Sequence, residues 1–261
     1  MKDHVWIPSR NGRLSAMIHL PETFREGDPL VVCCHGFTGD KVGSNQLTRN
    51  LAAFLEKSGY GVVRFDYLGS GDSDGEFSTD TFVAGWKEDL ANVFAWMETQ
   101  KRLTASPVVL YGHSLGGLIA LTHKDLAKRV VARVVFAPVT RPVHNFRDII
   151  LGENLWQDAL DGKEIANFYG RGFRLQSQFV QDLLKGRYDP IQDAKQLSTP
   201  LLIVHGTIDE VVPVQGSKDL NSVYCGRKEL VELEIDHVAT GAQDKLQAIV
   251  AGWLQKMFSS R

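Results

Sequence analysis

Five short runs of almost purely apolar, β-branched residues constrain the fold of this chain more than any other feature. Strands that are buried on both faces have this composition, and they occur in parallel sheets covered by helices on both sides. Between the runs, apolar residues recur at helical spacing, as in Leu47, Leu51 and Leu55. The pattern therefore predicts an α/β fold. The five runs are residues 30–34, 61–65, 108–111, 130–136 and 201–204.

The two ends of the chain add the remaining strands. Residues 5–8 and 14–20 flank Asn11-Gly12, a dipeptide typical of tight hairpins, and so predict an antiparallel pair at one edge of the sheet. Residues 229–235 form a last strand-like run, which a helical pattern follows. Together these runs predict a mostly parallel sheet.

The alternation of strands and helices stops after Pro138 and resumes near Leu197. A connection of that length is expected to be a functional element or a small subdomain. We predict a mostly helical cap at 139–197, inserted into a core domain formed by 1–138 and 198–261. Residues 139–192 hold seven basic and seven acidic residues, and this balance favours an uncharged or apolar ligand beneath the cap. The aromatic residues of the cap are Phe146, Trp156, Phe168, Tyr169, Phe173, Phe179 and Tyr188.

Composition excludes several classes of function. Twenty-nine Lys and Arg against 31 Asp and Glu give a net charge of -2, which is too small to attract nucleic acid. Three cysteines, two of them adjacent, form no disulfide framework and fit a reducing compartment. The sequence contains neither a secretory signal nor a run of about 18 apolar residues. We therefore expect a cytoplasmic protein without a membrane anchor, and a homodimer is compatible with the sequence.

The segment GHSLG at 112–116 follows one buried run directly and begins a helical one. A serine nucleophile is presented by such a strand, turn and helix, because the turn is too tight for large neighbours and lifts the hydroxyl clear of the sheet. The helix amino terminus then faces the negative charge that develops during acyl transfer. We predict Ser114 as the nucleophile. The alternative is a helix-capping serine in an inactive relative.

A second match to the same pattern, GDSDG, occurs at 71–75. It begins several residues beyond the end of the preceding strand, and its two aspartates would repel an oxyanion rather than stabilise it. We predict a structured turn at 66–75 and no catalytic role for Ser73.

A catalytic serine needs a base, which in this kind of turn is expected later in the chain. His237 follows the last strand-like run and so lies at the carboxyl edge of the sheet, where ligand-binding loops gather. His205 ends a buried run and is predicted to be a structural histidine, and His144 lies in the predicted cap. We therefore predict His237 as the base.

The acid that orients this base should come from a loop between Ser114 and His237. Asp209 lies in such a loop, directly after a buried strand, and we predict that it accepts the imidazole N–H. Glu210, in the same turn, and a solvated turn without catalytic function are the alternatives. Asp236, next to the base, is predicted to be a loop residue.

The oxyanion of acyl transfer needs two N–H donors. Leu115, directly after the nucleophile, supplies one, and the loop HGFTG at 35–39 supplies the other, which we assign to the Phe37 backbone. The alternative for that loop is a turn glycine beside a core phenylalanine. The sequence has neither metal-ligand spacing nor a phosphate-binding loop, so we expect no metal and no cofactor.

Four segments in this order resemble the α/β-hydrolase superfamily: HGF at 35–37, RFDYLGSGDSDG at 64–75, GHSLGG at 112–117 and HGTIDEVVP at 205–213. HGFTG at 35–39 combined with SDGEF at 73–77 is similar to bacterial cinnamoyl (feruloyl) esterases and related small carboxylesterases. The resemblance implies an eight-stranded, mostly parallel sheet, a cap inserted after the sixth strand, and hydrolysis of carboxylic esters through an acyl-enzyme. Leu115 stands where those esterases usually have glutamine.

These features predict a serine hydrolase that cleaves carboxylic esters of small acyl or aromatic acids through Ser114, His237 and Asp209. A serine at the turn disfavours the dehalogenase and epoxide hydrolase branches of the fold, which use a carboxylate there. Thioesterases, monoacylglycerol lipases, peptidases and carbon–carbon bond hydrolases share the triad and stay open as alternatives. A non-catalytic ligand receptor on this scaffold is the alternative from a different class.

Overall fold

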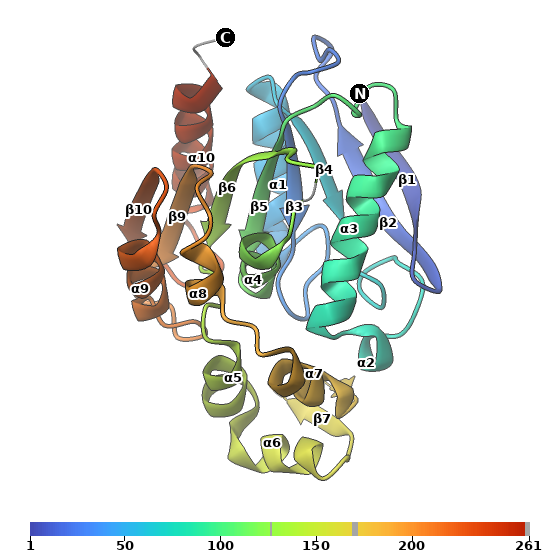
Figure 1. Ribbon diagram of the computed structural model, residues 1–261, viewed down its shortest axis with the longest axis vertical. Helices are drawn as coiled ribbons and strands as arrows, with labels where there is room; N and C mark the ends of the chain where they lie inside the picture. The colour runs from blue at the N-terminus through green and yellow to red at the C-terminus, as the bar shows by residue number, and fades with distance from the viewer. Residues whose placement is uncertain (126, 169–171, 259–261) are drawn as a thin grey trace.

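A single eight-stranded sheet runs through the middle of the molecule in the computed structural model, which describes residues 1–125, 127–168 and 172–258 (Figure 1). The strand order is β1-β2-β4-β3-β5-β6-β9-β10. The β1–β2 and β2–β4 pairs are antiparallel and the other pairs are parallel, which confirms the predicted sheet. The strands are β1 (Lys2–Ser9), β2 (Gly12–His19), β3 (Leu30–Cys34), β4 (Gly61–Phe65), β5 (Val108–His113), β6 (Val130–Phe136), β9 (Leu201–Gly206) and β10 (Lys228–Leu233).

The central strands are apolar throughout because helices cover both faces of the sheet. Every residue of β3, β4, β5 and β9 is buried. Helices α1 and α10 pack on one face, and α3, α4, α8 and α9 pack on the other, so the core has two hydrophobic layers. These helices are α1 (Leu47–Lys57), α3 (Val83–Thr99), α4 (Leu115–Thr122), α8 (Pro190–Ala194), α9 (Gln215–Val223) and α10 (Gln243–Phe258).

The cap follows β6, the sixth strand of the chain, and lies beyond the carboxyl end of the parallel strands (Figure 1). It is mostly helical, as predicted, but it also holds a two-stranded antiparallel sheet that the sequence did not indicate, because its strands are only four and three residues long. Tyr169, one of the predicted cap aromatics, lies outside the described residues. The cap elements are α5 (Pro142–His144), the π-helix η2 (Asn145–Leu151), α6 (Gly152–Leu160), β7 (Ile165–Phe168), β8 (Phe173–Leu175) and α7 (Gln178–Gly186).

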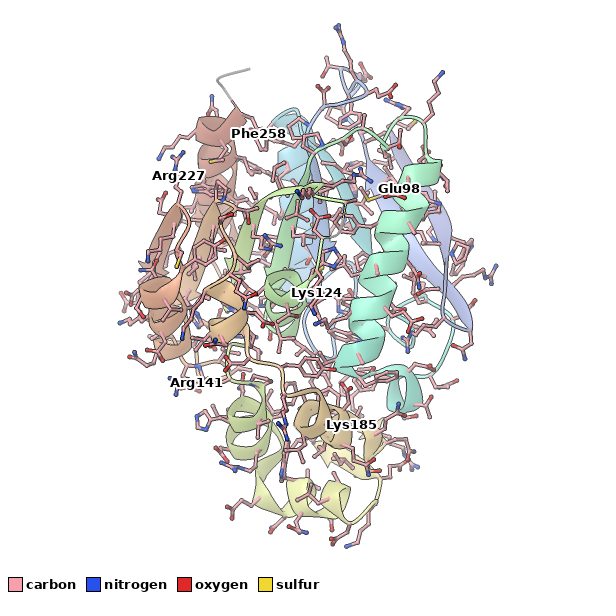
Figure 2. The ribbon with its side chains drawn as sticks, viewed as in Figure 1. Glu98, Lys124, Arg141, Lys185, Arg227 and Phe258 are labelled. Carbon is pink, nitrogen blue, oxygen red and sulfur yellow. The ribbon has the colours of Figure 1, made fainter. Side chains whose placement is uncertain are left out.

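A surface ion pair lies at the point where the chain leaves the core for the cap. Arg141, labelled in Figure 2, donates to Asp219 of α9 at 2.5 Å. Lys185, also labelled there, is an exposed residue of the last turn of α7. Both arginine and aspartate at this junction are solvent-accessible, so the pair contributes little to the free energy of folding.

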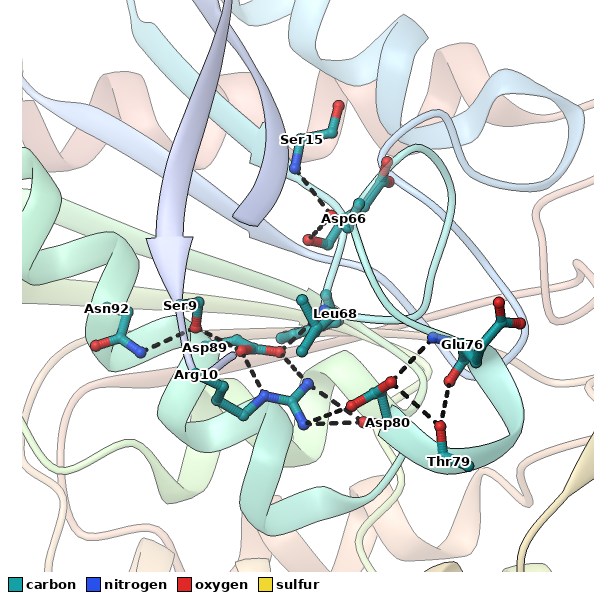
Figure 3. Close-up of polar contacts among 12 residues, drawn as sticks. Ser9, Arg10, Ser15, Asp66, Leu68, Glu76, Thr79, Asp80, Asp89 and Asn92 are labelled. Carbon is teal, nitrogen blue, oxygen red and sulfur yellow. Dashed lines mark hydrogen bonds and ion pairs between the residues drawn. The ribbon is translucent and has the colours of Figure 1, made fainter. Parts of the chain in front are cut away.

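A buried carboxylate joins the edge hairpin to the interior of the core. Asp89 of α3 is fully buried and accepts hydrogen bonds from Ser9 Oγ at 2.6 Å and from Arg10 Nε and Nη2, both at 2.9 Å (Figure 3). The same carboxylate accepts the Leu68 N–H at 3.0 Å. Four donors thus compensate for the loss of hydration of this charge, and they tie the segment after β4 to both β1 and α3.

None of the helices in the described part of the chain combines the length and the apolar character that are needed to cross a bilayer.

Removing the buried carboxylate should destabilise the protein strongly. We expect Asp89→Ala to lower the free energy of unfolding by about 3–5 kcal/mol. The substitution removes the nearer carboxylate partner of Arg10 and leaves the Ser9 hydroxyl and the Leu68 N–H without their acceptor. Urea denaturation followed by circular dichroism measures the loss. The control is Asp74→Ala, which removes the exposed partner of Arg13 and should cost far less. Equal losses in the two variants would contradict this account of Asp89.

Candidate active site

Ser114 lies in a sharp turn between β5 and α4. Its backbone has φ 56° and ψ -122°, a conformation that a residue with a Cβ rarely adopts. The turn is tight enough to require glycine on both sides: a Cβ on Gly112 would lie 2.4 Å from the carbonyl oxygen of Gly116, and a Cβ on Gly116 would lie 2.2 Å from that of Cys34. The Ser114 N–H donates to the Phe136 carbonyl at 3.0 Å, so the strained turn is fastened to the end of β6. This geometry is that of a nucleophile-bearing turn.

The structure brings His237 and Asp209 together from loops that are 28 residues apart. His237 Nδ1 lies 2.7 Å from Asp209 Oδ2, at hydrogen-bond distance, and the side chain of Asp209 is fully buried. Because the imidazole donates its Nδ1–H to the carboxylate, its Nε2 carries the lone pair. His237 and Ser114 line the same cavity, so the structure places the predicted base and nucleophile on one surface.

Several donors keep Asp209 ionised despite its burial. Its Oδ1 accepts the N–H groups of Val211 at 2.9 Å and Val212 at 2.8 Å. Burial acts to raise the pKa of Asp209, but the bonds from His205 and His237 outweigh it and hold the pKa below its ordinary value. The carboxylate is therefore charged at neutral pH and can stabilise a protonated His237.

His205, which the sequence predicts to be a structural histidine, also supports the acid. It is fully buried, and its Nδ1 lies 2.7 Å from Ser217 Oγ. Its Nε2 lies 2.9 Å from the Val212 carbonyl oxygen and 3.4 Å from Asp209 Oδ2. His205 thus holds both ends of the turn that carries the acid.

His113 is a residue of the site that sequence reasoning missed. Its Nε2–H donates to the His237 carbonyl oxygen at 2.9 Å, and the two imidazole rings lie 4.9 Å apart. Burial, and next the positive charge of a protonated His237, lower the pKa of His113 to about 3. A neutral His113 therefore anchors the loop that carries the base. The only signal in the sequence was a polar residue at the end of an otherwise apolar strand.

The two amides assigned to the oxyanion both lie beside Ser114. Leu115 is the first residue of α4, and Phe37 follows Gly36, at which a Cβ would lie only 3.0 Å from Ser114 Cβ. Neither the Phe37 N–H nor the Leu115 N–H donates to another group among the residues that the structure describes. Both donors are thus free to bind an oxygen that carries developing negative charge.

The second GxSxG segment has a different role, as predicted. Ser73 Oγ donates to the Asp66 carbonyl at 2.8 Å and accepts the Ser15 N–H at 2.8 Å. Asp66 and Ser15 are labelled in Figure 3, where the hairpin meets the segment after β4. Lys41 Nζ lies 2.5 Å from Asp66 Oδ2, so a buried ion pair completes the turn. Ser73 holds this turn together and does not face the cavity.

A cavity of about 500 Å³ opens beside Ser114. Core loops form most of its wall, and Ile150 is the one lining residue from the described part of the cap. The described aromatic rings of the cap pack against one another and against Phe37 instead of lining the cavity. Three acidic residues line the cavity, and no Lys or Arg does so among the described residues. The acidic residues are Asp40, Glu210 and Asp236.

Sequence comparison identifies relatives of this chain. The profile of the alpha/beta hydrolase family matches residues 31–252. The chain is 30% identical to the human Protein ABHD12B over 76% of its own length and 51% of the relative. It is 28% identical to the lysophosphatidylserine lipase ABHD12 of Danio rerio, over 80% of this chain and 50% of the relative. An uncharacterized 31.7 kDa protein of Escherichia coli is 28% identical over 94% of this chain and 97% of the relative. The chain thus spans about half the length of the two animal relatives.

Solved structures share the fold at low sequence identity. Est1E from Butyrivibrio proteoclasticus with bound ferulic acid superposes with a TM-score of 0.82 at 20% identity, over 98% of this chain and 99% of that chain. Alpha/beta hydrolase domain-containing protein 10 from mouse superposes with a TM-score of 0.74, also at 20% identity, over 98% and 99% of the two chains. Both proteins therefore have the same architecture as this chain.

The neutral state of His113 makes stability depend on pH. The pKa of about 3 in the folded protein lies below the 6.5 of an ordinary histidine, so this stabilisation is complete above pH 6.5 and is lost as the pH falls toward 3. Glutamine keeps an N–H donor but does not titrate. As the pH falls from about 6.5 to 4, we therefore expect the free energy of unfolding to decrease less in His113→Gln than in the wild type. Urea denaturation across this range checks the difference. His144→Gln, on the exposed surface of the cap, is the control, and a wild-type pH dependence in both variants would contradict the role of His113.

Proposed function

Because the chain belongs to the alpha/beta hydrolase family, we propose that it is a serine hydrolase that cleaves carboxylic esters through an acyl-enzyme. The observation that carries the proposal is the hydrogen bond of 2.7 Å between Asp209 and His237, on the wall of the cavity that also exposes Ser114 in its strained turn. A serine, an oriented imidazole and two free amides are the parts that acyl transfer requires.

The chemistry proceeds in two half-reactions. His237 Nε2 takes the proton of Ser114 as Oγ attacks the ester carbonyl carbon, and the amides of Phe37 and Leu115 bind the resulting oxyanion. The intermediate collapses as the C–O bond to the alcohol breaks, and the protonated His237 gives its proton to the departing oxygen. Water then attacks the acyl-enzyme by the same route, and the carboxylic acid and free Ser114 are released.

For the substrate, we propose an ester of a small acyl or aromatic acid. One relative is a lysophosphatidylserine lipase by name, and the similar structure of Est1E holds ferulic acid, so aliphatic and aromatic acyl groups both have a counterpart. The three carboxylates at the cavity disfavour an anionic alcohol such as a phosphodiester headgroup. Methyl ferulate tested beside p-nitrophenyl esters of four to eight carbons, a monoacylglycerol and an acyl-CoA distinguishes feruloyl esterase, carboxylesterase, lipase and thioesterase activity.

From the near-neutral charge and the cysteine content we also propose a small-molecule substrate, a cytoplasmic location and no nucleic acid partner. One alternative of the same fold is a peptidase, which requires that a peptide fits the acidic cavity. Hydrolysis of peptide p-nitroanilides would report this activity. A ligand receptor without catalysis would bind esters and leave them intact.

Separate alanine substitutions of the serines in the two GxSxG segments test which of them is the nucleophile. We expect Ser114→Ala to lower kcat for p-nitrophenyl butyrate by about 10⁴-fold or more, because it removes the hydroxyl that forms the acyl-enzyme. The variant should also lose labelling by a fluorophosphonate probe. Ser73→Ala is the matched control, because it removes the same atom from the same sequence pattern. It should keep labelling and turnover, and loss of activity in Ser73→Ala alone would reverse the assignment.

The acidic residues at the cavity should make the rate of hydrolysis depend on the charge of the ester's alcohol. Butyrate esters of choline, of the uncharged isostere 3,3-dimethylbutanol and of 3-hydroxypropanesulfonate differ mainly in charge. We expect kcat/KM for the anionic ester to be about 10-fold below that of the other two, and Glu210→Gln to narrow the gap. Stopped assays with chromatographic detection measure all three. Equal rates on the three esters at low salt would contradict the role of the carboxylates.

A further inference from the structure

Phe37 faces two parts of the molecule at once. It lies in the loop after β3, where it lines the cavity beside Ser114. Its ring, by contrast, packs among four other phenylalanine rings, which together with it form what we call the aromatic cluster. The cluster consists of Phe37, Phe77 of α2 (Phe77–Asp80), and Phe146, Phe168 and Phe179 of the cap.

The contacts of the Phe37 ring come from three separate elements of the cap. Its centroid lies 5.0 Å from that of Phe146 in η2, in an edge-to-face arrangement, and 5.1 Å from that of Phe179 in α7. The ring stacks on Phe168 of β7 at 5.6 Å. Phe146 and Phe179 also contact each other at 4.8 Å, so the cap rings support one another. Such geometries are directional, and several of them together define a single orientation of the ring.

The backbone of this loop needs such support. Gly39 N–H donates to the Gly36 carbonyl at 3.1 Å, which closes a tight turn around Phe37 and Thr38. Thr38 has φ 58°, a left-handed conformation that costs free energy for a β-branched residue. A strained turn persists only where its surroundings determine it fully, and the ring contacts of Phe37 supply that constraint.

The cap touches the cavity itself very little. Ile150 is its one lining residue among those described, whereas its buried rings Phe146, Phe168 and Phe179 meet the oxyanion loop directly. An effect of the cap on the reaction would thus pass through Phe37 more than through contact with the substrate.

We propose that the aromatic cluster is a positioning device for the oxyanion hole: the cap phenylalanines hold the ring of Phe37, and thereby the Phe37 N–H, at the place where the oxyanion forms. The proposal rests on the esterase function proposed above. It makes Phe146, Phe168 and Phe179 positioning residues, because each acts on the reaction through Phe37. Its consequence is that the packing of the cap controls transition-state stabilisation more than substrate binding.

Phe37→Leu and Phe179→Leu test the proposal with p-nitrophenyl butyrate. Leucine keeps the backbone N–H but removes the ring, so we expect kcat to fall about 10-fold while KM stays within about twofold. The double variant should fall no further than Phe37→Leu, because both changes loosen the same donor.

A pair of inhibitors reports on the oxyanion hole directly. An alkyl trifluoromethyl ketone forms a hemiketal oxyanion on the serine, whereas the matched alkyl methyl ketone binds chiefly as a carbonyl. The affinity of each variant for the trifluoromethyl ketone should fall by about the same factor as kcat, and affinity for the methyl ketone should not change.

Phe94→Leu is the matched control, because Phe94 is a buried ring of α3 whose ring contact is with His123 rather than with a ring of the aromatic cluster. It should lose stability but keep kcat and both affinities. If Phe37→Leu and Phe179→Leu resemble Phe94→Leu in kcat and in trifluoromethyl ketone affinity, the cluster has only a structural role and the proposal is wrong. If the wild type hydrolyses no ester, the proposed function itself fails.

Discussion

The site depends on one strained turn, in which a serine holds a positive φ between a buried strand and a helix. The strained backbone conformation of Ser114 is stabilised by its surroundings: Gly112 and Gly116 are in close backbone contact, and the carbonyl at the end of β6 accepts the Ser114 N–H. In the acyl transfer that we propose, the same turn presents the hydroxyl together with the first amide of α4, so that one local conformation fixes the proposed nucleophile and one proposed oxyanion donor.

A buried carboxylate is the second constraint. An isolated Asp209 would be too costly to bury, and four donors compensate for that cost: two backbone amides of its own turn, His205 and His237. The bond to His237 therefore stabilises the folded loop, and in the mechanism that we propose it also orients the base. His113 holds the other side of the loop that carries His237, because its Nε2–H donates to the His237 carbonyl oxygen. His237 is therefore held both at its imidazole and at its backbone carbonyl.

Local sequence was enough to predict the sheet, the turn at Ser114 and the loops that carry Asp209 and His237. Each of these depends on neighbours in the sequence: an apolar run, two glycines, or a polar residue just after a strand. The roles of His113 and His205 in holding the loops, and the meeting of Phe37 with Phe179, depend on residues far apart in the chain. No periodicity encodes such contacts. The balanced charge of the cap favours an uncharged ligand, yet the cavity wall comes mainly from acidic core loops.

The central claim is that an ester transfers its acyl group to Ser114. Rapid acid quenching of the protein with a slowly deacylating ester, followed by peptide mass mapping, tests it most directly. We expect the mass of one acyl group on the peptide that contains Ser114, formed before the steady state and absent in Ser114→Ala. Ester turnover without an acylated Ser114, or an acyl group on another residue, would contradict it.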